Sequence, residues 1–234
     1  GLVETSSRNN LQAYGLTDAA APAGKAGLWL LDPRNVFIQT GGTGTLSAGT
    51  FTPTVNDATI DPSTITTALQ AGTSVEINTG NTGVQEGNIT VVNAVTTAAG
   101  SANASLTLKA ANNITVSDVI NLSTMTGAGN VSLLADVDAS GVGTVTISAA
   151  VTSGATGTVT LQGAGRLQVG TTLTAKDVVF QPSTLAASMG VVDPIGTVQV
   201  LLSDLQALSA TGTVTVGRAD GTGTIRIGGT APLD

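Results

Sequence analysis

Two aspartates separated by one residue, Asp136 and Asp138, form the most chemically suggestive pair in the sequence, with Asp118 not far before them. Paired carboxylates can supply the acid and the base for polysaccharide cleavage. The segment Asp136–Gly141 also matches the first half of a calcium-binding loop, but Ile147 stands where the closing glutamate should be. We therefore interpret the segment as a polar turn, with calcium binding and catalysis as the two alternatives.

Other chemistry is sparse. The chain has no His and no Cys, which removes the commonest general base and the imidazole and thiolate metal ligands. No phosphate-binding loop, dinucleotide-binding glycine motif or Gly-x-Ser-x-Gly elbow occurs. The sequence thus predicts no enzyme, no cofactor, and no catalytic, cofactor-binding or metal-binding residues.

Composition narrows the possible partners. Hydrophobic residues make up 41% of the 234 residues and charged residues only 10%, against about 25% charged in ordinary globular domains. The net charge is −7, and the few basic residues are scattered. We expect no nucleic-acid partner, because no basic patch is present. We also expect no membrane insertion, because no apolar run approaches the roughly 20 residues that a membrane helix needs.

The elements that would position these side chains are expected to be very short strands. Between residues 104 and 162, apolar residues alternate with small hydroxylated ones in segments separated by Gly, Asn, Asp, Ala and Ser. A two-residue period indicates strands with one buried face, and such frequent short units are typical of a solenoid. We predict an all-β fold, a single β-solenoid domain over residues 1–234. The clearest segments are Leu106–Leu108, Ile114–Val116, Val131–Leu133, Val145–Ile147 and Val159–Leu161.

Interruptions of this pattern predict a loop and short helical excursions. Residues 40–62, rich in Gly and Thr, are expected to form a loop or lateral excursion that faces partners. A helix is expected from Asp61, a capping residue, to Gly72. Further short helices are predicted at Ser203–Ser209 and Ser183–Met189.

Three residue types carry more specific expectations. Asn88 and Asn113 each begin an Asn-Ile-Thr-Val unit, and we expect them at turns, in the left-handed conformation, bonded to Asn in the next repeat. Trp29 is interpreted as a core residue, the alternative being an exposed platform for sugar stacking. The threonines flanking Val145, Val159 and Val214 predict hydroxyl-rich solvent faces, with ice binding as the alternative.

The N-terminal segments Gly1–Ser6, Gly27–Pro33 and Asn35–Ile38, together with the repeats over Asn88–Ile147, resemble filamentous-haemagglutinin-type large exoproteins. These are secreted adhesins of two-partner secretion systems in Gram-negative bacteria. The resemblance implies a right-handed parallel β-helix, export across the outer membrane and a role in adhesion. The fold class predicted is therefore an all-β, right-handed parallel β-helix with short helical excursions.

These expectations combine into a structural and adhesive function. We predict a rod segment of a secreted or surface-exposed bacterial exoprotein, located outside the cell, that meets a receptor or glycan on a host or neighbouring cell. The alternative is a subunit that stacks end to end into an extracellular fibre. It is considered because Gly1–Glu4 and Gly223–Gly229 look like repeat material rather than caps.

Overall fold

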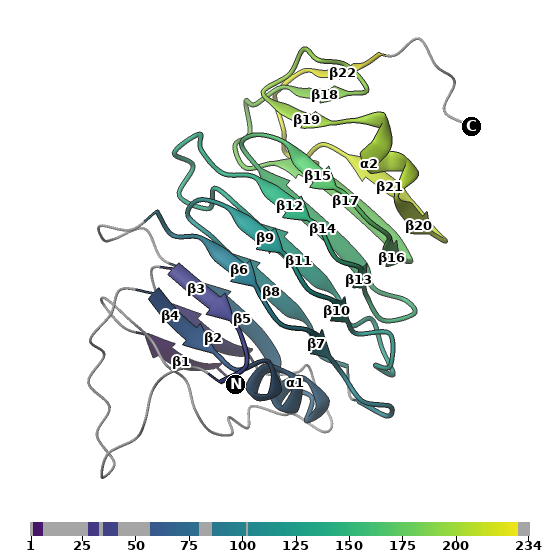
Figure 1. The fold of residues 1–234 in the computed structure, drawn as a ribbon. Coiled ribbons are helices and arrows are strands. Elements are labelled where there is room, and N and C mark those ends of the chain that lie inside the picture. The colour runs from purple at the N-terminus through teal and green to yellow at the C-terminus, as the bar shows by residue number, and fades with distance from the viewer. Residues whose placement is uncertain are drawn as a thin grey trace.

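The computed structural model describes residues 2–6, 28–32, 35–41, 57–79, 86–101 and 103–228, with side chains from Asn35 onward. The described strands lie side by side in an elongated stack that runs from the N-terminal to the C-terminal end of the chain (Figure 1). Neighbouring strands within each sheet are paired in parallel, so the stack is built from parallel sheets.

Four sheets account for the described strands. Sheet A has eight strands, in the spatial order β1 (Leu2–Ser6), β2 (Leu28–Asp32), β5 (Ser74–Asn78), β8 (Leu106–Lys109), β11 (Val131–Leu134), β14 (Thr158–Gly163), β17 (Asp177–Pro182) and β21 (Val214–Val216). Sheet B has six, in the order β15 (Leu167–Val169), β12 (Val145–Ile147), β9 (Ile114–Val116), β6 (Ile89–Val91), β3 (Asn35–Ile38) and β4 (Asp57–Ile60). Sheet C has five, in the order β20 (Leu208–Ala210), β16 (Leu173–Ala175), β13 (Val151–Thr152), β10 (Ile120–Asn121) and β7 (Val95–Thr96). Sheet D has three, in the order β19 (Val198–Val200), β18 (Met189–Val191) and β22 (Ile225–Ile227).

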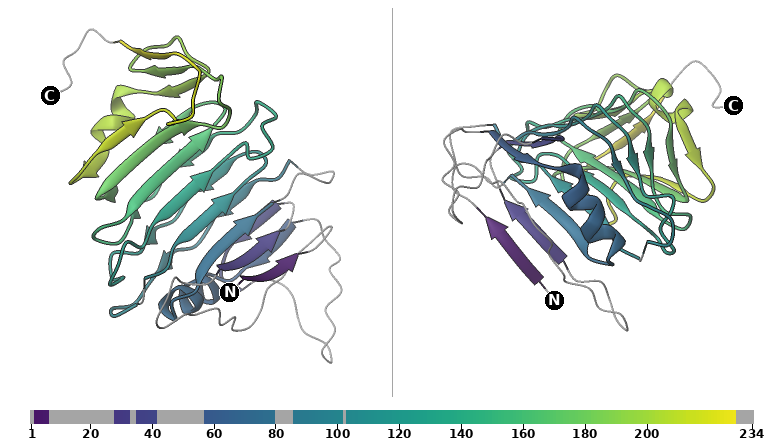
Figure 2. Two further views of the ribbon diagram at one scale, coloured as in Figure 1. Left: turned by 180° about the vertical axis from the view of Figure 1, so that it is seen from behind. Right: turned by 60° about the horizontal axis from the view of Figure 1, so that its bottom comes forward.

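In the middle of the chain, successive strands come from sheets A, B and C in turn, as in β8, β9 and β10 followed by β11, β12 and β13. We call each such set of three strands a tier. Each tier pairs with the tiers before and after it, and Figure 2 shows the sheets enclosing a shared interior. The spacing between paired strands is irregular, since side-chain hydrogen bonds between them join residues from 19 positions apart (Gln162 and Gln181) to 53 positions apart (Asn35 and Asn88).

The alternation in the sequence explains the core. In the described strands of the central tiers, apolar residues point inward and the intervening Ser, Thr, Gln or Asn residues remain half-buried on the outer face. Stacking aligns the inward residues, as in the fully buried row of Val75, Leu106, Val131, Val159 and Val178. The predicted strand segments between residues 104 and 162 are thus confirmed. Burial of such aliphatic side chains stabilises the fold by about 1.5 to 3 kcal/mol each.

Helix α1 (Pro62–Gln70) begins and ends where the sequence predicted. The carboxylate of Asp61 accepts hydrogen bonds from the Ser63 backbone N–H at 2.8 Å and from its hydroxyl at 2.7 Å. Gly72 follows the helix with a φ of +84°, a conformation that glycine adopts without strain. The buried side of α1 includes Ile65 and Leu69, and the helix packs against β5 and β7.

This cap predicts a pH-dependent contribution to stability. The hydrogen bond from the Ser63 hydroxyl, aided by the backbone N–H groups of Ser63 and Gly41, lowers the pKa of Asp61 against the opposing effect of partial burial. A lowered folded-state pKa stabilises the protein above the unfolded-state pKa, and this stabilisation disappears as the pH falls through the folded-state pKa. We expect Asp61→Ala to lower the free energy of unfolding by about 1 kcal/mol at pH 7, and the difference to shrink below about pH 4.

Urea denaturation at pH 7 and pH 3 measures this effect. Asp61→Asn is the matched control, because Asn caps helices about as well as Asp but does not titrate in this range. A constant difference between Asp61→Ala and the natural protein at both pH values would contradict the assignment.

Of the other two predicted helices, one is present but shorter than predicted and one is absent from the described residues. Helix α2 (Leu202–Gln206) lies in the predicted region, but Leu208 already belongs to β20. The helix predicted at Ser183–Met189 is wrong: residues 183–188 form bends and turns, and Met189 begins β18. The side chains of Met189 and Val191 are buried in β18, so pairing within sheet D overrides the local helical preference.

The predicted fold class, an all-β right-handed parallel β-helix, is also corrected. The described strands form four separate parallel sheets and no closed barrel, and α1 contributes Ile65 and Leu69 to the buried core. Regular winding fails at both ends. Strand β4 follows β3 in the chain yet lies outside it at the sheet edge, and the last strands form a separate three-stranded sheet, sheet D, which meets the start of β15 through an isolated parallel bridge between Arg166 and Gln199. Parallel sheets with a helix that packs into the core are closer to an α/β-like arrangement.

The predicted loop over residues 40–62 is corrected in part. Residues 42–56 lie outside the described residues, but Asp57–Ile60 is the strand β4, paired with β3. Ala58 and Ile60 of this strand are buried in the core. Residues 57–60 of the predicted loop are therefore a strand that belongs to the core.

Candidate interaction surfaces

Asp136 lies at a corner between β11 and β12 and is almost completely buried. One carboxylate oxygen accepts hydrogen bonds from the Ser140 hydroxyl at 2.9 Å and the Gly141 N–H at 3.0 Å. The other oxygen accepts a hydrogen bond from the hydroxyl of Ser183. Asp136 also has a φ of +55°. Its carboxylate therefore holds the corner in shape and ties it to the segment after β17.

The other two acids do not share this position. Asp138 is exposed and accepts a hydrogen bond from the Ser140 N–H at 3.3 Å, whereas Asp118 accepts one from the Val119 N–H at 2.7 Å. Within the described ranges, no group of three or more His, Cys, Asp or Glu side chains is placed to hold a metal ion. The geometry agrees with the interpretation of a polar turn, and it gives Asp136 a structural role.

The asparagines before the Ile-Thr-Val units do connect the tiers. The N–H of Asn88 donates to the side-chain oxygen of Asn35 at 2.8 Å, the N–H of Asn113 donates to Asn88 at 3.0 Å, and the N–H of Thr144 donates to Asn113 at 2.9 Å. The predicted bonding between repeats is confirmed. The predicted left-handed conformation is wrong, because neither Asn88 nor Asn113 has a positive φ. These side chains satisfy backbone donors at the point where each strand begins.

Outside the core, hydroxyl and amide side chains form rows in register. On the outer face of sheet C the row contains Thr96, Asn121, Thr152, Thr174 and Ser209. Each of these side chains is half-buried or exposed, so the row is accessible along five strands. Sheet B carries a shorter row of Thr90, Thr115 and Thr146. The threonines predicted to form hydroxyl-rich faces are also accessible: those flanking Val145 and Val159 are half-buried, and those flanking Val214 are exposed. The side chain of Trp29 lies outside the described residues.

At the C-terminal end, a cavity of about 460 Å³ opens between α2 and the last strands of sheets A, C and D. Its lining is almost entirely apolar, with Gln206 as the polar exception. The wall formed by α2 is held by Asp204, whose carboxylate accepts hydrogen bonds from the N–H groups of Val169 and Leu201 and from Arg166. The lining residues are Val191, Leu202, Leu205, Gln206, Leu208, Ala210, Val214, Val216 and Ile227.

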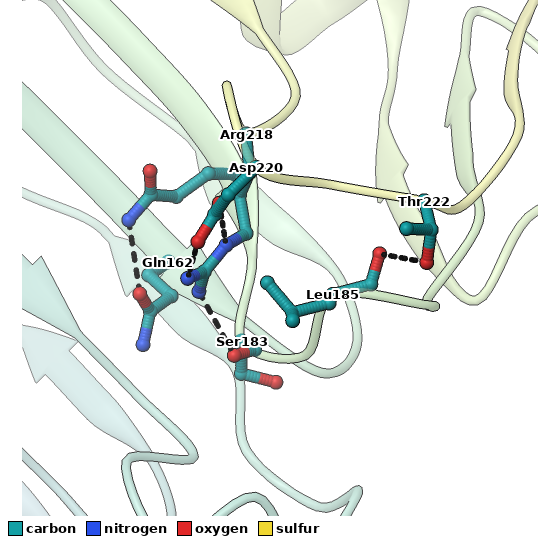
Figure 3. A network of polar contacts seen from close by, with 7 residues as sticks. Gln162, Ser183, Leu185, Arg218, Asp220 and Thr222 are labelled. Carbon is teal, nitrogen blue, oxygen red and sulfur yellow. Dashed lines mark hydrogen bonds and ion pairs between the residues drawn. The ribbon is translucent and has the colours of Figure 1, made fainter.

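A polar network fixes the segment that leads from β21 to β22 (Figure 3). Arg218 donates to Asp220 at 3.0 Å and to the Ser183 carbonyl at 3.1 Å, and Thr222 donates to the Leu185 carbonyl at 3.3 Å. The hydrogen bond between Arg218 and Asp220 raises the pKa of the arginine and lowers that of the aspartate. Sequence reasoning did not reveal these contacts, because Ser183 and Leu185 lie 35 and 37 positions before Arg218 and Thr222. Likewise, Val169 and Arg166 lie 35 and 38 positions before Asp204.

No family model matches the chain, and no curated protein matches it. The resemblance to filamentous-haemagglutinin-type exoproteins therefore stays a prediction. Among the described helices, none is long and apolar enough to cross a membrane.

Proposed function

We propose that this protein is a structural and adhesive segment of a secreted or surface-exposed bacterial exoprotein. The supporting observation is the row of hydroxyl and amide side chains on sheet C, which repeats across five strands of a rigid stack. A long scaffold with a repeating polar face suits contact with an extended surface better than the capture of one small molecule.

Repetition explains how such a face can bind. Neighbouring strands are about 4.8 Å apart, so the row offers donors and acceptors at regular intervals to a receptor or glycan. A single neutral hydrogen bond contributes only about 0.5 to 1.5 kcal/mol. Several weak contacts in one rigid row reinforce one another because the later ones form at high effective concentration.

This proposal predicts that removing hydroxyls from the sheet C row weakens adhesion. The triple variant Thr96→Val, Thr152→Val and Thr174→Val keeps side-chain shape and strand preference. Three lost hydrogen bonds should reduce attachment by tenfold or more. The measurement counts chain-coated beads that remain on host or bacterial cells under flow.

The control is Thr107→Val with Thr160→Val, on the outer face of sheet A, where the register aligns Thr107 with Ser132 and Ser132 with Thr160. We expect this variant to bind like the natural chain. Adhesion of the natural chain no stronger than that of albumin-coated beads would contradict the proposed function. An equal loss of adhesion in both variants would contradict the assignment of the adhesive surface to sheet C.

A further inference from the structure

The final tier exposes side chains that belong to core rows. Val214 aligns with Val178, which is fully buried, yet Val214 is 44% exposed. Ile225 and Ile227 align with the buried Met189 and Val191, yet they are 45% and 74% exposed. These residues face the interior of the stack, and the described part of the chain places no further tier over them.

The apolar cavity lies on the same end. It is lined by α2, β18, β20, β21 and β22. Of these, β20, β21 and β22 are edge strands of sheets C, A and D in the described topology. Edge strands carry backbone donors and acceptors that can pair with another chain. We call this surface, formed by residues 202–228, the C-terminal face. It combines exposed core residues, a cavity and strand edges.

The opposite end of the stack differs. There Ala58, Ile60 and the α1 residues Ile65 and Leu69 are at most 3% exposed. Thus the described core side chains of β4 and α1 are covered at the N-terminal end, whereas core positions at the C-terminal face are open. Indefinite end-to-end stacking needs two complementary open ends, which the described residues do not offer.

Charge distribution favours contact between two C-terminal faces. Around this face Arg218 pairs with Asp220 and Arg226 pairs with Asp193, so both signs are equally present. Two copies can therefore approach through their C-terminal faces without net repulsion.

We propose that a second copy of this chain docks on the C-terminal face, giving a closed, two-fold symmetric, tail-to-tail dimer. In such an isologous contact Val214, Ile225 and Ile227 of each copy cover the other's cavity and exposed core. The inference does not rest on the adhesive function proposed above.

Sedimentation velocity across a concentration series tests the dimer. We expect the natural chain to dimerise, and Ile227→Lys to weaken dimerisation at least 100-fold because it places a charge in the apolar contact. Because Ile227 is already mostly exposed, the variant should fold normally, which circular dichroism verifies. The control is Val142→Lys, since Val142 is 63% exposed but lies at the Asp136 corner, and it should dimerise normally.

Orientation is tested with spin labels on single cysteines, which the Cys-free chain permits. Labels at Thr215 should give a short distance between copies, and labels at Thr66 in α1 a long one. A chain that stays monomeric at all concentrations, forms filaments, or dimerises unchanged in Ile227→Lys overturns the proposal. Short distances between Thr66 labels overturn it as well.

Discussion

Replacing Phe180 by alanine is expected to lower the free energy of unfolding by about 3 to 5 kcal/mol. Phe180 is the largest fully buried side chain among the described residues. It continues the core row of Leu133 and Leu161 and aligns with Val216 on the final tier. Its removal leaves a cavity that the neighbouring strand β14 cannot close, because β14 is held in register between β11 and β17.

The midpoint and slope of urea denaturation, followed by circular dichroism, measure this loss. The control is Val179→Ala on the same strand, since Val179 points outward and is half-buried. The control should cost less than about 1.5 kcal/mol. Similar losses in both variants would show that the inward and outward faces of β17 are wrongly assigned.

Replacing Asp204 by alanine should have the second large effect, about 3 to 5 kcal/mol. Its buried carboxylate accepts hydrogen bonds from Leu201 N–H at 2.8 Å and Val169 N–H at 2.9 Å, and from the Arg166 guanidinium at 3.3 Å. The substitution leaves two backbone donors without their carboxylate partner and removes the counter-charge of Arg166. Because Asp204 joins α2 to β15, we expect amide hydrogen exchange to accelerate first in residues 201–210.

Asp220→Ala is the matched control, because it also removes an aspartate paired with arginine, but at an exposed position. Exposed ion pairs contribute little to stability, so its denaturation curve should nearly coincide with that of the natural chain. If Asp220→Ala and Asp204→Ala destabilise the chain equally, burial does not determine the effect, and the role assigned to Asp204 is wrong.

Local patterns in the sequence predicted the local structure well. The alternation in Leu106–Leu108 and similar segments specifies strands because it makes one face apolar. Asp61, Pro62 and Gly72 specify α1 because capping, the fixed φ of proline and the conformational freedom of glycine act within the helix itself. Bonding through Asn88 and Asn113 was also predictable, since these residues recur at the start of equivalent strands.

The arrangement of sheets could not be predicted in the same way. Nothing near β4 indicates that it lies beyond β3, and nothing in Ser183–Met189 reveals that Met189 pairs with Val198 rather than continuing a helix. The contribution of α1 to the core likewise depends on its packing against β5 and β7. These features arise from contacts between distant segments, so the regular all-β winding expected from the repeats was wrong at both ends.

The candidate interaction surfaces were likewise predictable only where they depend on local sequence. Outward threonines follow from strand alternation, so the polar rows were predictable. The C-terminal face was not, because the residues that line its cavity come from three sheets and a helix. The sequence suggested that both ends are uncapped, whereas the described residues show a covered core at α1 and an open one at β21 and β22.

Amide hydrogen exchange along the whole chain, measured at high dilution, tests most directly the claim that stacked tiers cover one another up to an open C-terminal face. Strands β8, β11 and β14 are paired on both sides, so we predict the slowest exchange there. Exchange should be much faster in β21 and β22, and addition of concentrated chain should slow it specifically in these strands. Equal protection of β14 and β21 at every concentration would contradict the open face and the account built on it.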